Sequence, residues 1–425
     1  MESTQNTTYL IRGGVPLSGK LSVQGSKNSL LPILAGCILR PGIITLRHIP
    51  LISDGRALCD ILALLQCRVT GHDHSLSIDS RFAADTSIAP IYMKQTRGAF
   101  ILLGAMLARF HAFSCSLPGG CRLGKRPIDF HLDALTKMGV RFIETDGDTV
   151  NAVCDGLYGC ALTLPYPSVG ATQNILLAAC GANGKTVLSG AAIEPEVMEL
   201  IRFLRLRGFD IAKTGARQFT VIGAPELIGL CADTEFTLSA DRIAAVTYLA
   251  AAAITGGTLQ LDNITREELP NACTLFEKAG CEIAVQDGLT LQAPKRLHGF
   301  GAQVTGVHPA FATDMQPLFA AVAAKTDGDS SFTETVFENR FSHLAQLCQM
   351  GAKIKIRGKT AYFMPNDRLI GRELLAFDLR GGAALTIAAL GANGESRIDG
   401  VRYIARGYED LFGTLRRLGG RISPL

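Results

Sequence analysis

The sequence predicts an α/β protein of two domains, each an inside-out α/β barrel in which three βαβαββ repeats surround buried helices. The prediction rests on the chain length, on a segment that recurs six times, and on small-residue helices upstream of that segment. At 425 residues, the chain is longer than one ordinary core requires, which indicates two or more domains.

The recurring segment is a helix end followed by a turn and a strand. Its copies read L-Q-C-R-V, M-G-V-R-F, R-G-F-D-I, A-G-C-E-I, M-G-A-K-I and L-G-G-R-I, anchored at Gln66, Gly139, Gly208, Gly280, Gly351 and Gly419. Glycine at the anchor fits a helix C-cap that leads into a strand. The period is near 70 residues, whereas solenoid repeats run to about 20–50. Six copies therefore favour two domains of three repeats over a solenoid.

A small-residue helix, a turn and an alternating strand precede the recurring segment, as in L-A-A-A-A-I-T-G-G-T-L-Q-L at 249–261. Alanine-rich helices pack closely, so they suit the inside of a helical cluster covered by sheet. We expect residues 23–235 to form one domain with repeats one to three, and residues 236–425 to form the other. A first strand near Tyr9–Ile11 is expected to join the latter, which assigns residues 1–22 to it.

The first helix of each repeat is expected to begin at a Ser, Thr or Asp. These starts are Ser26-Lys27-Asn28, Thr96-Arg97, Ser168-Val169-Gly170, Asp241-Arg242, Thr313-Asp314 and Asp378-Leu379-Arg380. Ser, Thr and Asp are ordinary N-caps, which is one interpretation of the series. The cations in four of the six starts oppose the helix dipole, so capping does not explain them. Helix N-termini bind anions, and the series favours an anion-binding cleft.

One loop combines a thiol with several cations. Residues 115–131 read C-S-L-P-G-G-C-R-L-G-K-R-P-I-D-F-H, with Cys121 followed by Arg122, Lys125 and Arg126. Nearby positive charge stabilises a thiolate, so residues 115–126 are predicted to be a catalytic loop for an anionic substrate. A solvated basic loop with an incidental cysteine is the alternative.

Composition argues against several classes of protein. The 42 Lys+Arg against 38 Asp+Glu leave a charge of +4 without a like-charge block, which suits a small anionic ligand better than nucleic acid. Twelve cysteines without a C-x-x-C pair do not indicate a zinc site. The first nine residues do not resemble a signal peptide, and the most apolar run, Ala244–Ile254, is too short to span a bilayer. We therefore expect a soluble, cytoplasmic protein.

Longer motifs follow one another in a distinctive order. They are G-S-K-N at 25–28, L-P-G-G-C-x-x-G-x-R-P-x-D-x-H at 117–131, S-V-G-A-T at 168–172, E-P-E at 194–196, H-P-A-F-x-T-D-M-Q at 308–316, T-E-T-V-F-E-N-R-F at 333–341, D-L-R at 378–380 and R-G-Y-E at 406–409. In these motifs nearly the whole chain resembles the enolpyruvyl transferase family, whose fold is two domains of three repeats around buried helices. Within the family it is similar to the enzymes that act on UDP-N-acetylglucosamine. A 5-enolpyruvylshikimate-3-phosphate synthase-like enzyme is the alternative, but it would show N-A-G-T where residues 94–99 read K-Q-T-R-G-A, and would lack Cys121.

The resemblance implies transfer of the enolpyruvyl group of phosphoenolpyruvate to the 3-hydroxyl of UDP-N-acetylglucosamine, with release of phosphate, as the first committed step of peptidoglycan precursor synthesis. It implies no metal, no organic cofactor, no nucleic acid or membrane partner and no obligate protein partner. It makes Asp314 the carboxylate at the sugar hydroxyl, and Cys121 the thiol that adds to phosphoenolpyruvate and helps to protonate it.

The same resemblance implies the binding residues. Lys27, Arg126 and Arg406 match the clamp on phosphoenolpyruvate, of which Lys27 and Arg406 are also expected to be catalytic, with Arg97 and Arg380 nearby. Asn28 and Glu338 match contacts to the sugar or its phosphate. The positions that match the surroundings of the uridine diphosphate are Arg126, Pro127, Asp129, Ser168, Val169, Gly170 and Val336.

The chain departs from the family pattern at several positions. It has Tyr166 where the family has lysine, Ala244 where it has glutamate, and Ala405 where it has aspartate. A divergent or non-catalytic nucleotide-sugar-binding paralogue is therefore an alternative. Retention of Cys121 together with Asp314 favours the enzyme, because a binding module needs neither an acid nor a base.

Overall fold

The computed structural model describes residues 7–93, 97–116, 128–144 and 149–425, which form a mixed α/β structure. These residues form two compact units. The first unit holds residues 7–24 and 240–425, and the second holds the described residues between 25 and 239. Each unit has a hydrophobic core of its own.

Three helices are buried in the core of the first unit: α9 (Arg242–Thr255), α11 (Gln316–Ala323) and α13 (Leu379–Gly391). In α9, every residue from Ile243 to Ile254 is buried, and half of these are alanine. A helix that is apolar all round is stable only inside a protein, and short side chains let such helices approach closely. The alanine-rich segments therefore form the centre of the unit, as the sequence predicts.

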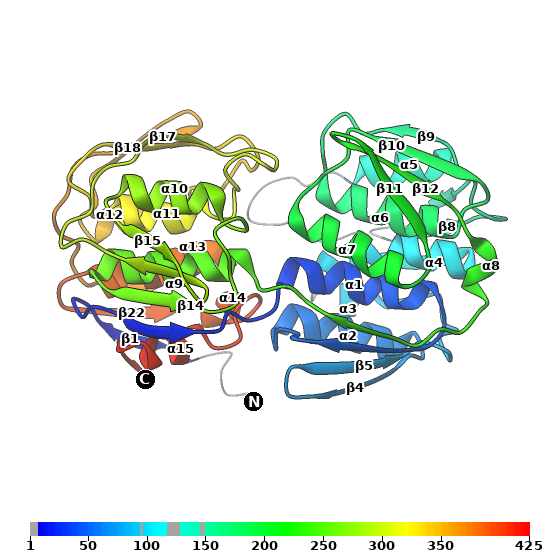
Figure 1. The fold of residues 1–425 in the computed structure, drawn as a ribbon, viewed down its shortest axis with the longest axis horizontal. Helices are drawn as coiled ribbons and strands as arrows, with labels where there is room; N and C mark the ends of the chain where they lie inside the picture. Colours follow the sequence, from blue (N-terminus) through cyan, green and yellow to red (C-terminus); the bar gives the residue numbers. More distant parts are fainter. Residues whose placement is uncertain (1–6, 94–96, 117–127, 145–148) are drawn as a thin grey trace. The chain divides into compact units, whose positions relative to one another are not determined.

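Three four-stranded sheets belong to the first unit, with the orders β21-β22-β1-β23, β15-β16-β14-β2 and β17-β18-β20-β19. The strands are β1 (Tyr9–Arg12), β2 (Ser18–Leu21), β14 (Thr258–Leu261), β15 (Glu282–Val285), β16 (Leu289–Gln292), β17 (Gly301–Val304), β18 (Ser330–Thr333), β19 (Ile354–Arg357), β20 (Thr360–Phe363), β21 (Glu373–Leu375), β22 (Glu395–Asp399) and β23 (Arg421–Pro424). Strand β1 is the expected first strand, and it pairs antiparallel with both β22 and β23. In Figure 1, the buried helices lie between β17 and β18 above and β1 and β22 below. The unit also contains the helices α10 (Pro270–Lys278), α12 (Leu344–Gln349), α14 (Val401–Ile404) and α15 (Leu411–Arg417).

The second unit is built from the same kinds of element. Its buried helices are α1 (Lys27–Leu39), α4 (Leu102–Phe110) and α6 (Val169–Cys180). Its sheets have the orders β13-β3-β5-β4, β11-β12-β10-β9 and β6-β8-β7. The strands are β3 (Ile43–Arg47), β4 (Arg68–His72), β5 (Ser75–Asp79), β6 (Ala112–Ser116), β7 (Arg141–Glu144), β8 (Thr149–Val153), β9 (Ala161–Thr163), β10 (Lys185–Ser189), β11 (Asp210–Gly215), β12 (Gln218–Ile222) and β13 (Thr234–Thr237).

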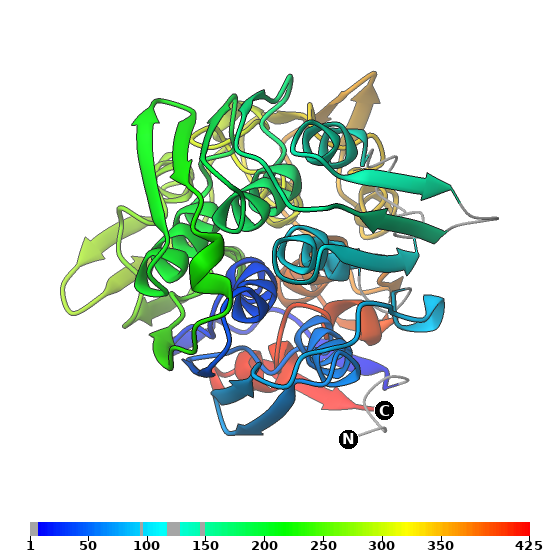
Figure 2. The same ribbon diagram turned by 90° about the vertical axis from the view of Figure 1, so that its right-hand side faces the viewer.

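The remaining helices of the second unit are α2 (Ser53–Leu64), α3 (Pro90–Met93), η2 (Arg97–Ile101), α5 (Asp129–Lys137), α7 (Pro195–Leu206) and α8 (Pro225–Ile228). Figure 2 shows this unit, coloured blue to green, with helices seen nearly end-on and strands outside them. Among the described residues of the whole chain, no helix combines the length and apolarity that crossing a membrane requires.

The anchors of the recurring segment share one backbone conformation. All six have a positive φ, between 69° and 102°, namely Gln66, Gly139, Gly208, Gly280, Gly351 and Gly419. Gly419, for example, joins the end of α15 to β23. Glycine adopts this conformation without steric cost, whereas Gln66 is the one anchor with a side chain. The expected C-cap turns are confirmed.

Four of the expected helix starts carry the expected side-chain cap. The hydroxyls of Ser26 and Ser168 and the carboxylates of Asp241 and Asp378 each accept a backbone N–H from the first turn. The expected start at Thr313-Asp314 is wrong, because α11 begins at Gln316 and no side-chain cap bond is made there. The carboxylate of Asp314 binds two guanidinium groups instead.

The buried helices of the first unit end at a common lysine. The ammonium of Lys325 follows α11 and donates to the carbonyls of Ile254 at 3.3 Å and Gly391 at 2.8 Å, at the ends of α9 and α13. Burial lowers the pKa of Lys325 below its usual value. A cation at helix C-termini is favourable because the dipole is negative there. The second unit has a similar contact, since Arg109 near the end of α4 donates to the carbonyl of Ile38 in α1 at 2.8 Å.

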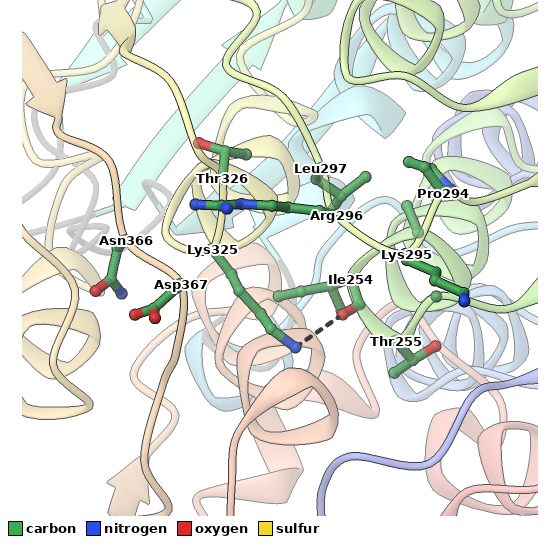
Figure 3. A pocket seen from close by; sticks show the side chains of 12 residues that line it. Ile254, Thr255, Pro294, Lys295, Arg296, Leu297, Lys325, Thr326, Asn366 and Asp367 are labelled. Atoms are coloured by element: carbon green, nitrogen blue, oxygen red, sulfur yellow. Dashed lines mark hydrogen bonds between the residues drawn. The ribbon is translucent and has the colours of Figure 1, made fainter.

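A cavity of about 280 Å³ lies beside Lys325. Figure 3 shows Lys325 reaching the carbonyl of Ile254, and Lys295 and Arg296 also line the cavity. None of the described residues expected at the active site lines this cavity. We therefore interpret Lys325 as a structural cap.

Replacing Lys325 by methionine should destabilise the protein, because the carbonyls of Ile254 and Gly391 both lose a charged donor. The expected loss is about 1–3 kcal/mol of unfolding free energy, measured in urea. Lys295→Met, at an exposed position in the same cavity, is the matched control and should change stability by less than about 0.5 kcal/mol. Equal effects of the two substitutions would contradict the capping role.

Candidate active site

Asp314 is held by two arginines in the first unit. The guanidinium of Arg340 binds one carboxylate oxygen, and Nε and Nη2 of Arg380 both lie 3.4 Å from the other. The side chains of Arg340 and Arg380 are 2% and 3% exposed, whereas that of Asp314 is 30% exposed. Two buried cations thus complement a carboxylate that solvent can reach.

Arg380 also begins a chain of hydrogen bonds that crosses to α9. Its Nη1 donates to the Tyr408 hydroxyl at 3.2 Å, which lies 2.7 Å from the Thr247 hydroxyl. Thr247 in turn donates to the carbonyl of Ile243. The hydroxyls of Tyr408 and Thr247 each accept one hydrogen bond and donate one, so burial leaves neither hydroxyl unsatisfied. This chain fixes the guanidinium of Arg380 relative to α9.

The segment that follows β18 holds Thr313 and Asp314 from one side. Arg340 donates from Nε and Nη2 to the Thr313 carbonyl, at 3.0 and 2.8 Å. Val336, expected near the uridine, is half-buried on this segment, and Glu338 is exposed. The structure therefore places Val336, Glu338 and Asp314 on two connected segments of one unit.

The loop that carries Arg406 is held by a glutamine. Gln24 donates from Nε2 to the Gly407 carbonyl at 3.0 Å and accepts the N–H of Glu409 at 3.1 Å. Arg406 is half-buried and lies between Ala405, the C-cap of α14, and Gly407. The two bonds fix the backbone on which Arg406 stands.

In the second unit, Lys27 pairs with Asp54. Their ammonium and carboxylate lie 2.8 Å apart, and the side chains are 12% and 4% exposed. Lys27 is the first residue of α1 and Asp54 lies in the first turn of α2. Asn28 follows on α1 and is half-buried. The acid offsets a cation that would otherwise be buried at the positive end of a helix.

A second group lies where α5 and α6 begin. The ring of His131 packs over Gly170, where an added Cβ would lie 3.3 Å from Cε1 of the imidazole. Asn174 donates from Nδ2 to Nδ1 of His131 at 2.9 Å. Asp129 is exposed at the start of α5, and Ser168 caps α6 ahead of Val169. The structure thus brings the expected 129–131 and 168–170 segments together.

Several expected residues have no described side chain. Cys121, Arg126 and Pro127 lie outside the described residues, as does the expected catalytic loop beyond Ser116. Arg97 begins η2, and its backbone alone is described.

Sequence reasoning missed the residues that hold the expected ones in place. Arg340 and Glu334 stand in the T-E-T-V-F-E-N-R-F motif, so the motif itself was the available signal. Asp54 and Gln24 had no such signal, because an acid in a first helical turn is ordinary. Each of these contacts joins residues that only the fold brings together.

The departures from the family pattern fall in different surroundings. Tyr166 is 40% exposed ahead of α6. Ala244 is fully buried in the first turn of α9, where its N–H is bound by the Asp241 cap. Ala405 caps the C-terminus of α14, next to Arg406.

The comparisons with known proteins agree over nearly the whole chain. The family model described as EPSP synthase (3-phosphoshikimate 1-carboxyvinyltransferase) matches residues 11–415. A UDP-N-acetylglucosamine 1-carboxyvinyltransferase 2 of Caldanaerobacter subterraneus is 39% identical, over 97% of this chain and 98% of its own. A UDP-N-acetylglucosamine 1-carboxyvinyltransferase of Synechocystis is 37% identical, over 100% of this chain and 96% of its own.

Solved structures are similar in fold. The enolpyruvyl transferase NikO from Streptomyces tendae superposes with a TM-score of 0.89 at 23% identity, covering 99% of both chains. An EPSP synthase from Acinetobacter baumannii gives a TM-score of 0.78 at 19% identity, covering 99% of this chain and 100% of its own. At these identities, the likeness supports the fold alone.

The pH dependence of stability should reveal the protonation of His343, which is 2% exposed and lies close to Arg340 of the Asp314 network. Burial lowers its pKa to about 4, the charge of Asp378 opposes this shift, and the charge of Arg340 reinforces it. Between the ordinary histidine pKa of about 6.5 and this value, the unfolded chain gains a proton that the folded chain does not, so stability falls as the pH falls. The parent should lose about 2 kcal/mol more than His343→Gln between pH 7.5 and 5.0, measured by urea unfolding. The same loss in both proteins would exclude His343 as the cause.

Proposed function

Because the chain belongs to the enolpyruvyl transferase family, we propose that it transfers the enolpyruvyl group of phosphoenolpyruvate to the 3-hydroxyl of UDP-N-acetylglucosamine and releases phosphate. The observation that carries this function is identity of 36–39%, over nearly the full length, to several relatives named for that activity. The family resemblance read from the motifs is confirmed. In a cell this reaction is the first committed step of peptidoglycan precursor synthesis, in the cytoplasm. The transferase is favoured over both the shikimate-type and the non-catalytic alternatives.

The proposal includes an internal architecture. Six βαβαββ repeats would make two inside-out barrels, with residues 1–22 and 236–425 in one domain and 23–235 in the other. In support, the described residues contain six buried helices of the same kind and six small sheets, three of each in either unit. The six positive-φ anchors stand at a spacing near 70 residues.

In the first unit, we assign Asp314 as the base that accepts the proton of the sugar hydroxyl. A partly exposed carboxylate oriented by two buried guanidiniums suits this role. A general base must first lie within hydrogen-bond reach of the proton that it accepts, and the two guanidiniums fix its position. Arg380 and Arg406 would bind the charges of phosphoenolpyruvate. Val336 and Glu338 would contact the nucleotide sugar.

In the second unit, Lys27 would bind and polarise phosphoenolpyruvate, with Asn28 at the sugar phosphate. The ion pair with Asp54 supports this role, since it holds the ammonium in place. Arg97 and Arg126 are assigned to the same anions. The residues assigned to the uridine diphosphate are Arg126, Pro127, Asp129, Ser168, Val169 and Gly170.

Asp314→Asn should lose at least about 100-fold in phosphate release at saturating substrates, because an amide cannot accept the hydroxyl proton. Its melting temperature should fall as well, since two buried guanidiniums lose their counter-charge. Binding of UDP-N-acetylglucosamine, followed by calorimetry well below the melting temperature, should persist. The parent should release phosphate from phosphoenolpyruvate only when the sugar nucleotide is present.

Asp410→Asn is the matched control for this substitution. Asp410 caps α15 by accepting the N–H of Gly413 at 2.8 Å, and asparagine caps nearly as well. Its turnover should stay within about twofold of the parent. If Asp314→Asn also turned over within a few-fold of the parent, Asp314 would be removed from the mechanism.

Cys121 is proposed to add covalently to phosphoenolpyruvate and to help protonate its methylene carbon. Burial raises the pKa of ten described cysteines, and Cys231 is exposed. A small anionic epoxide should therefore label Cys121 first, since cations beside a thiol favour the thiolate. Peptide mapping should find the adduct in the parent and in Cys231→Ser, and should lose it in Cys121→Ser. Faster labelling of another cysteine would refute the assignment.

A further inference from the structure

We propose that Glu334 is a positioning residue for the Asp314 carboxylate and acts through Thr313, an inference that rests on the proposed function. Glu334 directly follows β18 and is 3% exposed. It lies outside the set of substrate contacts assigned above. Burial of a carboxylate is costly unless hydrogen-bond donors surround it. The donors that bind Glu334 therefore indicate its role.

The carboxylate of Glu334 joins two segments. Its Oε1 accepts the backbone N–H groups of Val336 at 2.8 Å and Phe337 at 3.0 Å. Its Oε2 accepts the hydroxyl of Thr313 at 2.9 Å, from 21 residues away in the sequence. The first two bonds shape the turn that carries Val336, as a short side chain could also do. The third bond does not shape this turn, because its donor is Thr313, the residue before Asp314 on a different segment.

Arg340 also binds Thr313, through its carbonyl. It donates twice to the Thr313 carbonyl and once to Asp314, and it comes from the same segment as Glu334. Both the hydroxyl and the carbonyl of Thr313 are therefore held by residues 334–340. Because Asp314 is the next residue, its backbone position follows from that of Thr313. A displacement of about 1 Å at a reacting group can cost about 100-fold in rate, so a fixed Thr313 has a direct use in the reaction.

The test removes one hydroxyl. Thr313→Val keeps the shape of the side chain but deletes the donor to Glu334, and should lower kcat about tenfold. The KM values of both substrates should stay within about threefold, since binding contacts are kept. Thr313→Ser restores the hydroxyl and should restore kcat to within about twofold. A direct contact between Thr313 and substrate would instead raise KM, and that result would overturn the proposal.

Thr360→Val is the matched control. Its hydroxyl pairs with that of Thr333 at 2.9 Å between β18 and β20, in the same sheet. The substitution deletes a hydroxyl of the same kind without touching Thr313, and should leave kcat at the parental value. A fall in kcat equal to that of Thr313→Val would show a general effect of weakening the sheet and would overturn the positioning role.

Glu334→Gln provides an independent variant. The amide oxygen can still accept the N–H groups of Val336 and Phe337, while the amide nitrogen replaces the acceptor for Thr313. The variant should lose about as much kcat as Thr313→Val, and the double variant should lose no more than either one, because the same bond is broken. Losses that multiply in the double variant would overturn the coupling.

The outcomes separate the two proposals. A parent protein that releases no phosphate from phosphoenolpyruvate with UDP-N-acetylglucosamine would overturn the proposed function, and the positioning role with it. An active parent with Thr313→Val at parental kcat would overturn the positioning role alone. A lowered melting temperature without a change in kcat would likewise make Glu334 structural.

Discussion

In each unit, buried helices pack side by side, and the charges of their dipole ends must be compensated. The rest of the unit depends on this constraint. In the first unit, Lys325 bonds to the C-terminal ends of α9 and α13 just after α11 ends. The three negative helix ends therefore meet at one cation. A charge of opposite sign stabilises such helix ends, and Lys325 supplies it. The opposite ends of these helices carry the positive end of the dipole, which favours anions.

The positive ends are where the candidate catalytic residues stand. Arg380 lies in the first turn of α13, and Lys27 begins α1 in the second unit. A cation at a positive helix end is unfavourable by itself. Asp314 lies beside Arg380 and Asp54 beside Lys27, so each unit offsets this cost with a carboxylate from another element. These paired charges keep cations in place for an anionic substrate.

In the Asp314 network, the supporting arginines are buried and the carboxylate is accessible to solvent. Arg340 and Arg380 are almost fully enclosed, and Asp314 is the member that solvent reaches. Buried donors that are already in place hold a reactive group in one orientation. The same division explains why Glu334 is buried although it is acidic, because each of its oxygens has a donor.

The sequence by itself determined whatever depends on near neighbours. An N-cap bonds two or three residues ahead, so Ser26, Ser168, Asp241 and Asp378 were readable from their own surroundings. The same holds for the turns at Gly419 and its counterparts, where a helix end requires a positive φ. The motifs identified the family and therefore the residues expected to act.

Only the tertiary structure decided how those residues are held. Asp314 reads as a possible N-cap in the sequence, yet its partners are Arg340 and Arg380, 26 and 66 residues away. Lys325 was not singled out in the sequence, yet it donates to a carbonyl near the end of α9 that lies 71 residues before it. Such pairs form because packing of the helices brings them together, and no spacing along the chain encodes that distance. Periodicity and capping follow from local backbone geometry, whereas the pairing of buried charges follows from the fold.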